Sequence, residues 1–190
     1  MTLGTRPRQR LTLAVACMAQ GMMVLDVLIV SVALPAMQRE LHLSPAGLEW
    51  VVSGYALALA ALIPTGGALG DHFGRKRLFV SGVTLFTLAS VGCALSVSGA
   101  MLVGFRVIQG IGGGLLVPQV LTGIQLNFVV SARSRAIGLY SVALSIGAVA
   151  GQILGGTLVS ANLFGSGWRP IFLINIPIGV GVVAAAFRMK

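Results

Sequence analysis

The sequence predicts an all-α integral membrane protein with six transmembrane helices. Of its 190 residues, 56% are hydrophobic and only 9% are charged, whereas soluble domains carry roughly 25% charged residues. The apolar residues also gather in six long stretches, and a helix needs about 20 mainly apolar residues to cross the hydrocarbon of a bilayer. A soluble core has no room for this much apolar surface.

The breaks between the apolar stretches set the expected boundaries. We expect an N-terminal tail over residues 1–10, a transmembrane domain over 11–187 and a short end over 188–190, with helices over 11–36, 48–69, 78–96, 101–121, 137–159 and 171–187. The first stretch follows three arginines, as in a secretory signal, but it is longer than the apolar region of a signal. A first transmembrane helix is therefore the better interpretation.

The distribution of positive charge predicts the orientation. Ten of the thirteen Lys and Arg lie in flanks that share one side of the membrane, only Arg39 and Arg169 lie in flanks on the other side, and Arg106 lies within the fourth stretch. Short cytoplasmic flanks retain Lys and Arg during insertion. We therefore expect a multi-pass plasma-membrane protein with both termini in the cytoplasm.

The net charge of +9 raises the question of a nucleic-acid partner. A nucleic-acid interface gathers its basic residues on one water-facing surface, whereas here they form short clusters between apolar runs. The lipid bilayer is the expected partner, and nucleic acid is not. His42 and His72 have no ligand-spaced neighbours and no Ser, His and acid set occurs, so the sequence predicts neither a metal site nor an enzyme.

Asp26 is the acid that lies deepest in an expected transmembrane helix. An ionisable residue at such a place costs on the order of 2.5 to 3.5 kcal/mol on insertion, so it needs a reason. No Lys or Arg lies within a helical turn of it, and desolvation would favour its neutral form until water arrives. We expect Asp26 to carry a proton, and the alternative is a permanently protonated carboxyl that joins two helices.

Arg106 and Gln109 lie three residues apart in the fourth stretch, on one helix face. A buried arginine must find a carboxylate, a carbonyl or water, and Asp26 is the candidate carboxylate. The alternative is that Arg106 snorkels to the outer interface. Other buried polar side chains, such as Asn175, are expected to join helices rather than to contact substrate.

A stripe of small residues marks the fifth stretch. Gly147, Gly151 and Gly155 recur every four residues, Gly156 follows the last of them, and Gln152 stands after the central glycine. Such spacing lets two helix backbones approach closely. It suits either a static bundle or one that rearranges.

The segment that begins at the end of the second stretch reads GALGDHFGRKRLF and contains three glycines, one acid and three consecutive bases. We expect a compact loop in which charge-assisted hydrogen bonds hold two helix ends together. The alternative is that its basic residues only set the orientation. The candidate gating residues are Gly67, Asp71, Gly74, Arg75 and Lys76.

These motifs together resemble those of the major facilitator superfamily, and within it the fourteen-helix drug:proton antiporter family. The matching positions are the following: Gly67, Leu69, Asp71, Gly74, Arg75 and Lys76 between the second and third helices; Arg106, Gln109, Gly110 and Gly112 in the fourth; Gly147, Gly151, Gly155 and Gly156 in the fifth; Leu25, Asp26, Ala33, Leu34 and Pro35 in the first; Trp168, Arg169, Ile171, Phe172, Leu173, Asn175, Pro177 and Gly179 in the sixth.

The sequence departs from the family pattern at three places. Gln152 stands where the antiporter motif normally has proline, so the expected bend of the fifth helix is in doubt. Leu28 and Ser31 replace the usual Thr and Asn. The loop after the fourth helix lacks its usual acid, which leaves Arg133 and Arg135 without a local carboxylate.

The resemblance implies the fold, the energy source and the partners. It implies one half of a major facilitator fold, built from two inverted three-helix repeats, and export of small apolar or cationic compounds driven by a proton gradient without a cofactor. Asp26, Arg106 and Gln109 would couple the proton, and the fifth-helix glycines would permit rearrangement. Because such transporters place the substrate between two halves, we expect a fragment that lacks its C-terminal half, or a half that pairs with a second chain. The alternative is a non-transporting membrane protein or inactive remnant.

Overall fold

The computed structural model describes residues 7–161 and 166–188 and places them in helices joined by short turns. The helices are α1 (Pro7–Leu41), α2 (Pro45–Phe73), α3 (Arg75–Ala94), α4 (Gly99–Asn127), α5 (Val130–Ala161), α6 (Pro170–Leu173) and α7 (Asn175–Phe187). With α6 and α7 taken as one span, six helices among the described residues are long and apolar enough to cross a membrane. The prediction of an all-helical chain with six such helices is confirmed.

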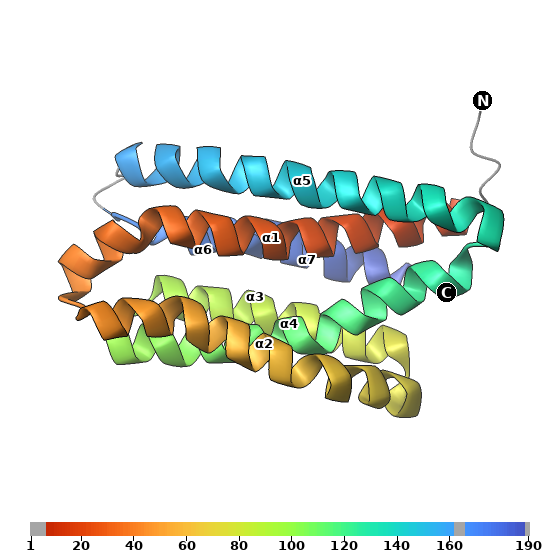
Figure 1. Ribbon diagram of the computed structural model, residues 1–190, viewed down its shortest axis with the longest axis horizontal. Coiled ribbons are helices and arrows are strands. Elements are labelled where there is room, and N and C mark those ends of the chain that lie inside the picture. Colours follow the sequence, from red (N-terminus) through yellow and green to blue (C-terminus); the bar gives the residue numbers. More distant parts are fainter. Residues whose placement is uncertain (1–6, 162–165, 189–190) are drawn as a thin grey trace.

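The helices pack as two interlocked sets of three. Most contacts join α1 to α5, α2 to α4 and α3 to α4, and Figure 1 shows α5 running along α1 while α2 and α3 flank α4. If the first three spans correspond in order to the last three, α1 corresponds to α4 and α2 corresponds to α5. The contact between α1 and α5 then corresponds to the contact between α4 and α2. This equivalence is what two inverted three-helix repeats require.

The expected helix boundaries were too narrow at most ends. The first five helices begin two to seven residues before the expected starts, and α2 and α4 also run past residues 69 and 121. Residues 7–10 are helical rather than part of a tail, whereas residues 1–6 and 189–190 lie outside the described part. Apolar composition marks the part of a helix that crosses hydrocarbon, but a helix continues into the interface until a cap or turn ends it.

Local signals explain where several helices begin. The Ser44 hydroxyl accepts a hydrogen bond from the Gly47 amide at the start of α2, and Pro45 occupies its first position. The Ser98 hydroxyl does the same for the Met101 amide at the start of α4. Ser at the N-cap and Pro at the first helical position both satisfy or avoid unpaired amides. The sixth expected helix differs because it is interrupted at Ile174, between α6 and α7.

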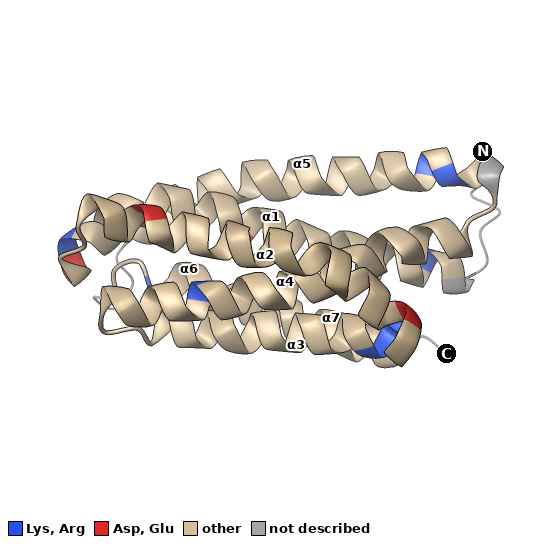
Figure 2. Ribbon diagram, turned by 60° about the horizontal axis from the view of Figure 1, so that its bottom comes forward, with Lys and Arg blue, Asp and Glu red and all other residues tan. Residues whose placement is uncertain are grey.

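Charged residues gather at the two ends of the bundle. Figure 2 shows blue and red segments there, whereas most of each helix is tan. The start of α1, the α2 to α3 junction, the α4 to α5 junction and the end of α7 all lie at one end (Figure 1). The basic flanks assigned to one side by the sequence therefore share one end of the molecule.

The opposite end is held by Arg169. Its guanidinium forms an ion pair with Glu40 at the end of α1, donates to the Ser96 carbonyl oxygen at 3.3 Å and lies over the Trp168 ring at 4.9 Å. These contacts connect the beginning of α6 to α1 and to the α3 to α4 turn. Because the ion pair is partly exposed, we assign it a contribution of only about 0.2–1 kcal/mol.

Candidate functional site

A buried ion pair lies at the centre of the bundle, between α1 and α4. Arg106 donates from Nη1 to Asp26 Oδ2 at 2.6 Å, and the two side chains are 1% and 0% exposed. Asp26 has no basic neighbour along its own helix, as the sequence indicated, but α4 supplies one across the bundle. The snorkelling interpretation of Arg106 is wrong, since its guanidinium turns inward to this carboxylate.

Two amide side chains complete the hydrogen bonding of Asp26. Its Oδ1 accepts from Gln109 Nε2 at 2.9 Å and from Asn175 Nδ2 at 2.7 Å. Ser90 on α3 accepts from the same Gln109 nitrogen at 2.8 Å. The network therefore joins α1, α3, α4 and α7, and three side chains donate hydrogen bonds to the carboxylate.

Arg106 is held by more than its carboxylate partner. Its Nε donates to the Val51 carbonyl oxygen of α2 at 3.1 Å, and its Nη1 also lies 2.7 Å from Gln109 Oε1. The guanidinium carbon lies 4.2 Å from the centre of the Tyr55 ring, a cation–π distance. A buried charge is tolerated only when its donors are satisfied in this way.

The sequence missed two members of this network. Asn175 was expected only to join helices, and Ser90 was not singled out. Ser90 donates to the Phe86 carbonyl one turn earlier, as Ser31 does to Val27, so nothing local distinguishes the serine that belongs to the network. The signal that was present for Asn175 is its place between Pro170 and Pro177, where α6 and α7 are interrupted.

The glycine stripe of α5 faces α1 at the level of Asp26. A Cβ atom on Gly147 would lie 2.8 Å from the Gly21 carbonyl oxygen, and one on Gly151 would lie 2.8 Å from the Leu25 carbonyl oxygen. A Cβ on Gly155 would meet Ile29 at 3.1 Å. These glycines therefore allow the two backbones to approach beside the buried carboxylate.

The other two residues of the predicted fifth-helix motif lie away from this contact. A Cβ on Gly156 would meet nothing within 4 Å, and Gln152 is exposed. The helix runs unbroken through Gln152 from Val130 to Ala161. With Gln152 in place of the proline of the family motif, α5 is thus a continuous helix.

The predicted gating loop is a single residue rather than a long loop. Only Gly74 separates α2 from α3, and its φ of 96° is a conformation that L side chains rarely adopt. Across this junction Arg75 Nη2 pairs with Asp71 Oδ1 at 2.7 Å, and Lys76 Nζ lies 3.5 Å from the Phe187 carbonyl oxygen of α7. The charge-assisted contact between helix ends is therefore present, in a tighter form than the sequence indicated.

Gly67 lies inside α2 and has a looser neighbourhood. A Cβ there would lie 3.8 Å from Pro118, an ordinary contact, whereas one on Gly66 would lie 2.4 Å from the Gly114 carbonyl oxygen. The close helix approach at this point thus belongs to Gly66, which the motif match did not select.

Gly74 offers a direct stability test. We expect Gly74→Ala to lower the free energy of unfolding by about 1–2 kcal/mol, because a residue with a side chain is strained at positive φ. Nothing lies within 4 Å of the added Cβ, so crowding contributes nothing. Gly67→Ala is the matched control and should not destabilise, since alanine favours a helix interior. Denaturant titration in detergent micelles measures both, and equal effects would contradict the assignment.

Arg133, which has no local carboxylate after the fourth helix, bonds to a backbone carbonyl group instead. Arg133 donates from Nη2 to the Gln125 carbonyl oxygen near the end of α4 at 2.8 Å. Carbonyl groups in the last turn of a helix lack intrahelical donors. The Gln125 carbonyl oxygen is thus a partner for Arg133 where the family resemblance implied a carboxylate.

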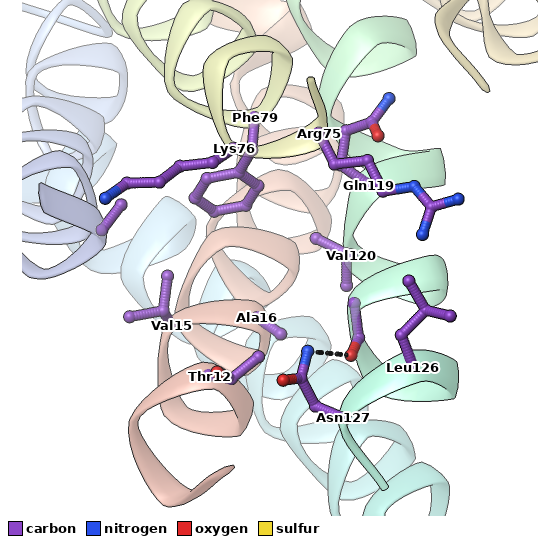
Figure 3. A pocket seen from close by; sticks show the side chains of 12 residues that line it. Thr12, Val15, Ala16, Arg75, Lys76, Phe79, Gln119, Val120, Leu126 and Asn127 are labelled. Carbon is purple, nitrogen blue, oxygen red and sulfur yellow. Dashed lines mark hydrogen bonds between the residues drawn. The ribbon is translucent and has the colours of Figure 1, made fainter. Parts of the chain in front are cut away.

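A cavity of about 320 Å³ opens among α1, α3, α4 and α7 at the end that carries the α2 to α3 junction. Its walls include Val15, Phe79 and Val120, and its rim includes Arg75 and Lys76. Figure 3 shows these two basic side chains reaching to opposite sides of Phe79. Two of the predicted gating residues, Arg75 and Lys76, therefore border a partly apolar cavity whose lining does not include the buried ion pair.

Comparisons with known proteins agree with this architecture. Residues 14–190 match the sequence profile of the Major Facilitator Superfamily. The chain is 44% identical over 179 residues to a probable actinorhodin transporter of Streptomyces coelicolor, covering 94% of this chain and 31% of that protein. It is 41% identical to the methylenomycin A resistance protein of Bacillus subtilis, covering 88% and 35%, and 39% identical to the tetracenomycin C resistance and export protein of Streptomyces glaucescens, covering 96% and 33%.

The fold is shared with a solved transporter structure. A bacterial homologue of the human lysosomal transporter Spinster, in an inward-facing and occupied conformation, superposes with a TM-score of 0.79 at 23% identity. The match covers 98% of this chain and 44% of that one, as expected for one half of the fold. The chain spans about a third of the length of the curated relatives named above. With its six membrane-length helices and a profile match over nearly its whole length, this chain is a multi-pass membrane protein and belongs to the Major Facilitator Superfamily.

Proposed function

We propose that this chain is one half of a proton-coupled exporter of small apolar or cationic compounds. The relatives named above include a resistance protein and a resistance and export protein, which supports export of small molecules. The observation that carries the proposal is the Asp26–Arg106 pair, because it places an acid that can exchange a proton in the centre of a membrane-spanning bundle. Intramembrane acids of this kind mark proton pathways.

The geometry supports two charge states of the site. When Asp26 is ionised, it neutralises Arg106 directly. When a proton binds Asp26, Arg106 keeps the Val51 carbonyl, the Gln109 oxygen and the Tyr55 ring as partners. Protonation thus weakens the electrostatic attraction between α1 and α4, while the guanidinium keeps its other interaction partners.

This change in attraction supplies the energy difference that transport requires. A ligand shifts a conformational equilibrium only if it interacts differently with the two states. In the proposed cycle, proton release from Asp26 on the cytoplasmic side favours substrate capture, and proton binding from the other side favours release. The α5 glycines permit α1 to move, and the Asp71–Arg75 junction closes the cytoplasmic end.

A second six-helix unit is part of the proposal. The chain covers about a third of its relatives, and α2 and α5 are the least buried of the six spans. Exposed apolar side chains follow α5 at Val142, Ile146, Val149 and Ile153. We place the second unit, in the same chain or in another, against α2 and α5, with both termini of this chain in the cytoplasm.

Asp26→Asn tests the function. In vesicles that contain this chain with its second half, the variant should lose proton-driven substrate flux by at least about 100-fold, since positioned proton transfer contributes factors of this order. Asparagine keeps the size of the side chain, so insertion should not change. Substrate uptake and proton release are measured together after a pH step.

The control for Asp26→Asn is Glu49→Gln, which neutralises an exposed acid at the start of α2. It should transport like the unaltered chain. Undiminished flux in Asp26→Asn would refute the coupling role. Absence of flux in the unaltered assembly would instead support the non-transporting alternative.

A further inference from the structure

Asn175 enters the buried site in an unusual way. It is the first residue of α7, directly after the interruption at Ile174, and its side chain is fully buried. Its Nδ2 donates to Asp26 Oδ1 at 2.7 Å and lies 3.3 Å from Ser90 Oγ. The interruption of the helix thus delivers an amide group to the carboxylate that the proposed function makes the proton carrier.

The two amides that contact Asp26 are not equivalent. Gln109 uses both ends of its amide, because its nitrogen donates to Asp26 and Ser90 while its oxygen accepts from Arg106. Asn175 Oδ1 is buried and has no hydrogen-bond partner within residues 7–161 and 166–188. Leaving such an oxygen unpaired is unfavourable, so its presence beside an ionisable group calls for an explanation.

We propose that Asn175 is a positioning residue that serves both protonation states of Asp26 by turning its side-chain amide. In the ionised state Nδ2 donates to the carboxylate, and in the protonated state Oδ1 accepts from the new carboxyl O–H. The inference rests on the proposed function, since it assumes that Asp26 binds and releases a proton.

The proton on Asp26 Oδ1 reverses what this atom needs. The new O–H has to find an acceptor, yet both amides present a donor to Oδ1. Rotation about the last side-chain bond of asparagine is soft and roughly two-fold, so half a turn exchanges the Asn175 nitrogen for its unpaired oxygen. No covalent bond changes except the O–H bond that the proton forms.

Gln109 is unable to make the same exchange without loss. Its oxygen is bound to Arg106 Nη1, and turning its amide would set a donor against the guanidinium. Gln109 therefore continues to donate to the second lone pair of Oδ1. In this arrangement the Gln109 amide keeps its orientation in both protonation states, and the Asn175 amide turns between them.

Infrared difference spectroscopy on the chain in lipid nanodiscs tests the inference. Lowering the pH should produce a protonated-carboxyl band that is absent from Asp26→Asn. The same step should shift an asparagine amide band, identified by side-chain nitrogen labelling of the three asparagines, Asn127, Asn162 and Asn175. Asn175→Leu should remove that shift and move the carboxyl band to higher frequency, because the O–H has lost its acceptor.

Asn127→Leu is the matched control, because Asn127 bonds to the Gly123 carbonyl oxygen in α4 and not to the site. It should preserve both bands. The inference is wrong, and the proposed function stands, if the carboxyl band appears while no labelled amide band shifts and Asn175→Leu leaves the carboxyl band unchanged. If no band depends on Asp26 at any pH, both are wrong. The labelled, unsubstituted chain gives its answer even if Asn175→Leu fails to fold.

Discussion

Replacing Arg106 by leucine is expected to lower the free energy of unfolding by about 3–5 kcal/mol, because removing one member of a buried ion pair leaves the other charge uncompensated. Among the described residues, the remaining carboxylate would keep the amides of Gln109 and Asn175 as donors. Thermal and denaturant unfolding of the purified chain measure it.

The double replacement Asp26→Leu with Arg106→Leu completes the cycle. It removes both charges, and buried pairs replaced by apolar side chains often lose little stability. We therefore expect the double variant to be more stable than Arg106→Leu alone, although it should transport nothing. Arg77→Leu, at an exposed position, is the control and should change the unfolding free energy by less than about 0.5 kcal/mol. Independent, additive effects of the two single replacements would show that the pair does not couple.

Replacing Gly151 by leucine is expected to disturb both stability and function. The Cβ atom alone would lie 2.8 Å from the Leu25 carbonyl oxygen and 3.2 Å from Leu28 Cβ. Overpacking of this kind costs about 1–3 kcal/mol. Since Leu25 precedes Asp26, the displaced backbone of α1 should also carry the carboxylate away from Arg106 and reduce coupled flux.

Gly156→Leu is the matched control on the same helix. It gains the same intrinsic helix preference, but its Cβ would meet nothing within 4 Å. We expect near-normal stability and flux. If Gly151→Leu unfolds and transports like Gly156→Leu, the close approach of α5 to α1 at Asp26 does not exist in the membrane.

The fold was largely predictable because the bilayer imposes a simple rule on sequence. Long apolar stretches indicated the six spans, and the basic flanks indicated which helix ends belong together. The interruption at Ile174 was not predicted, since the segment Ile171–Phe187 is apolar throughout apart from Asn175. Composition measures burial in lipid, whereas a helix break depends on where individual backbone groups find partners.

The site was predictable in its charged members and not in its polar ones. Asp26 and Arg106 stand out because charge inside a membrane is costly, but the contact between them joins residues 80 positions apart and depends on the packing of α1 against α4. Ser90 has no such signal, since a serine in a membrane helix commonly bonds to its own preceding turn. Asn175 was recognised as polar, but its role follows only from its distance to Asp26.

The hydrogen bond from Arg106 Nε to the Val51 carbonyl has a mechanical consequence. The Arg106 guanidinium donates from Nε to the backbone of α2 and from Nη1 to the Asp26 side chain of α1. Because the guanidinium is rigid, a shift of α2 along α1 must lengthen one of these two hydrogen bonds. In the proposed cycle, protonation of Asp26 and the position of α2 are therefore coupled through Arg106. A distance probe between α1 and α2 should then respond to pH in the unaltered chain and should not respond in Asp26→Asn.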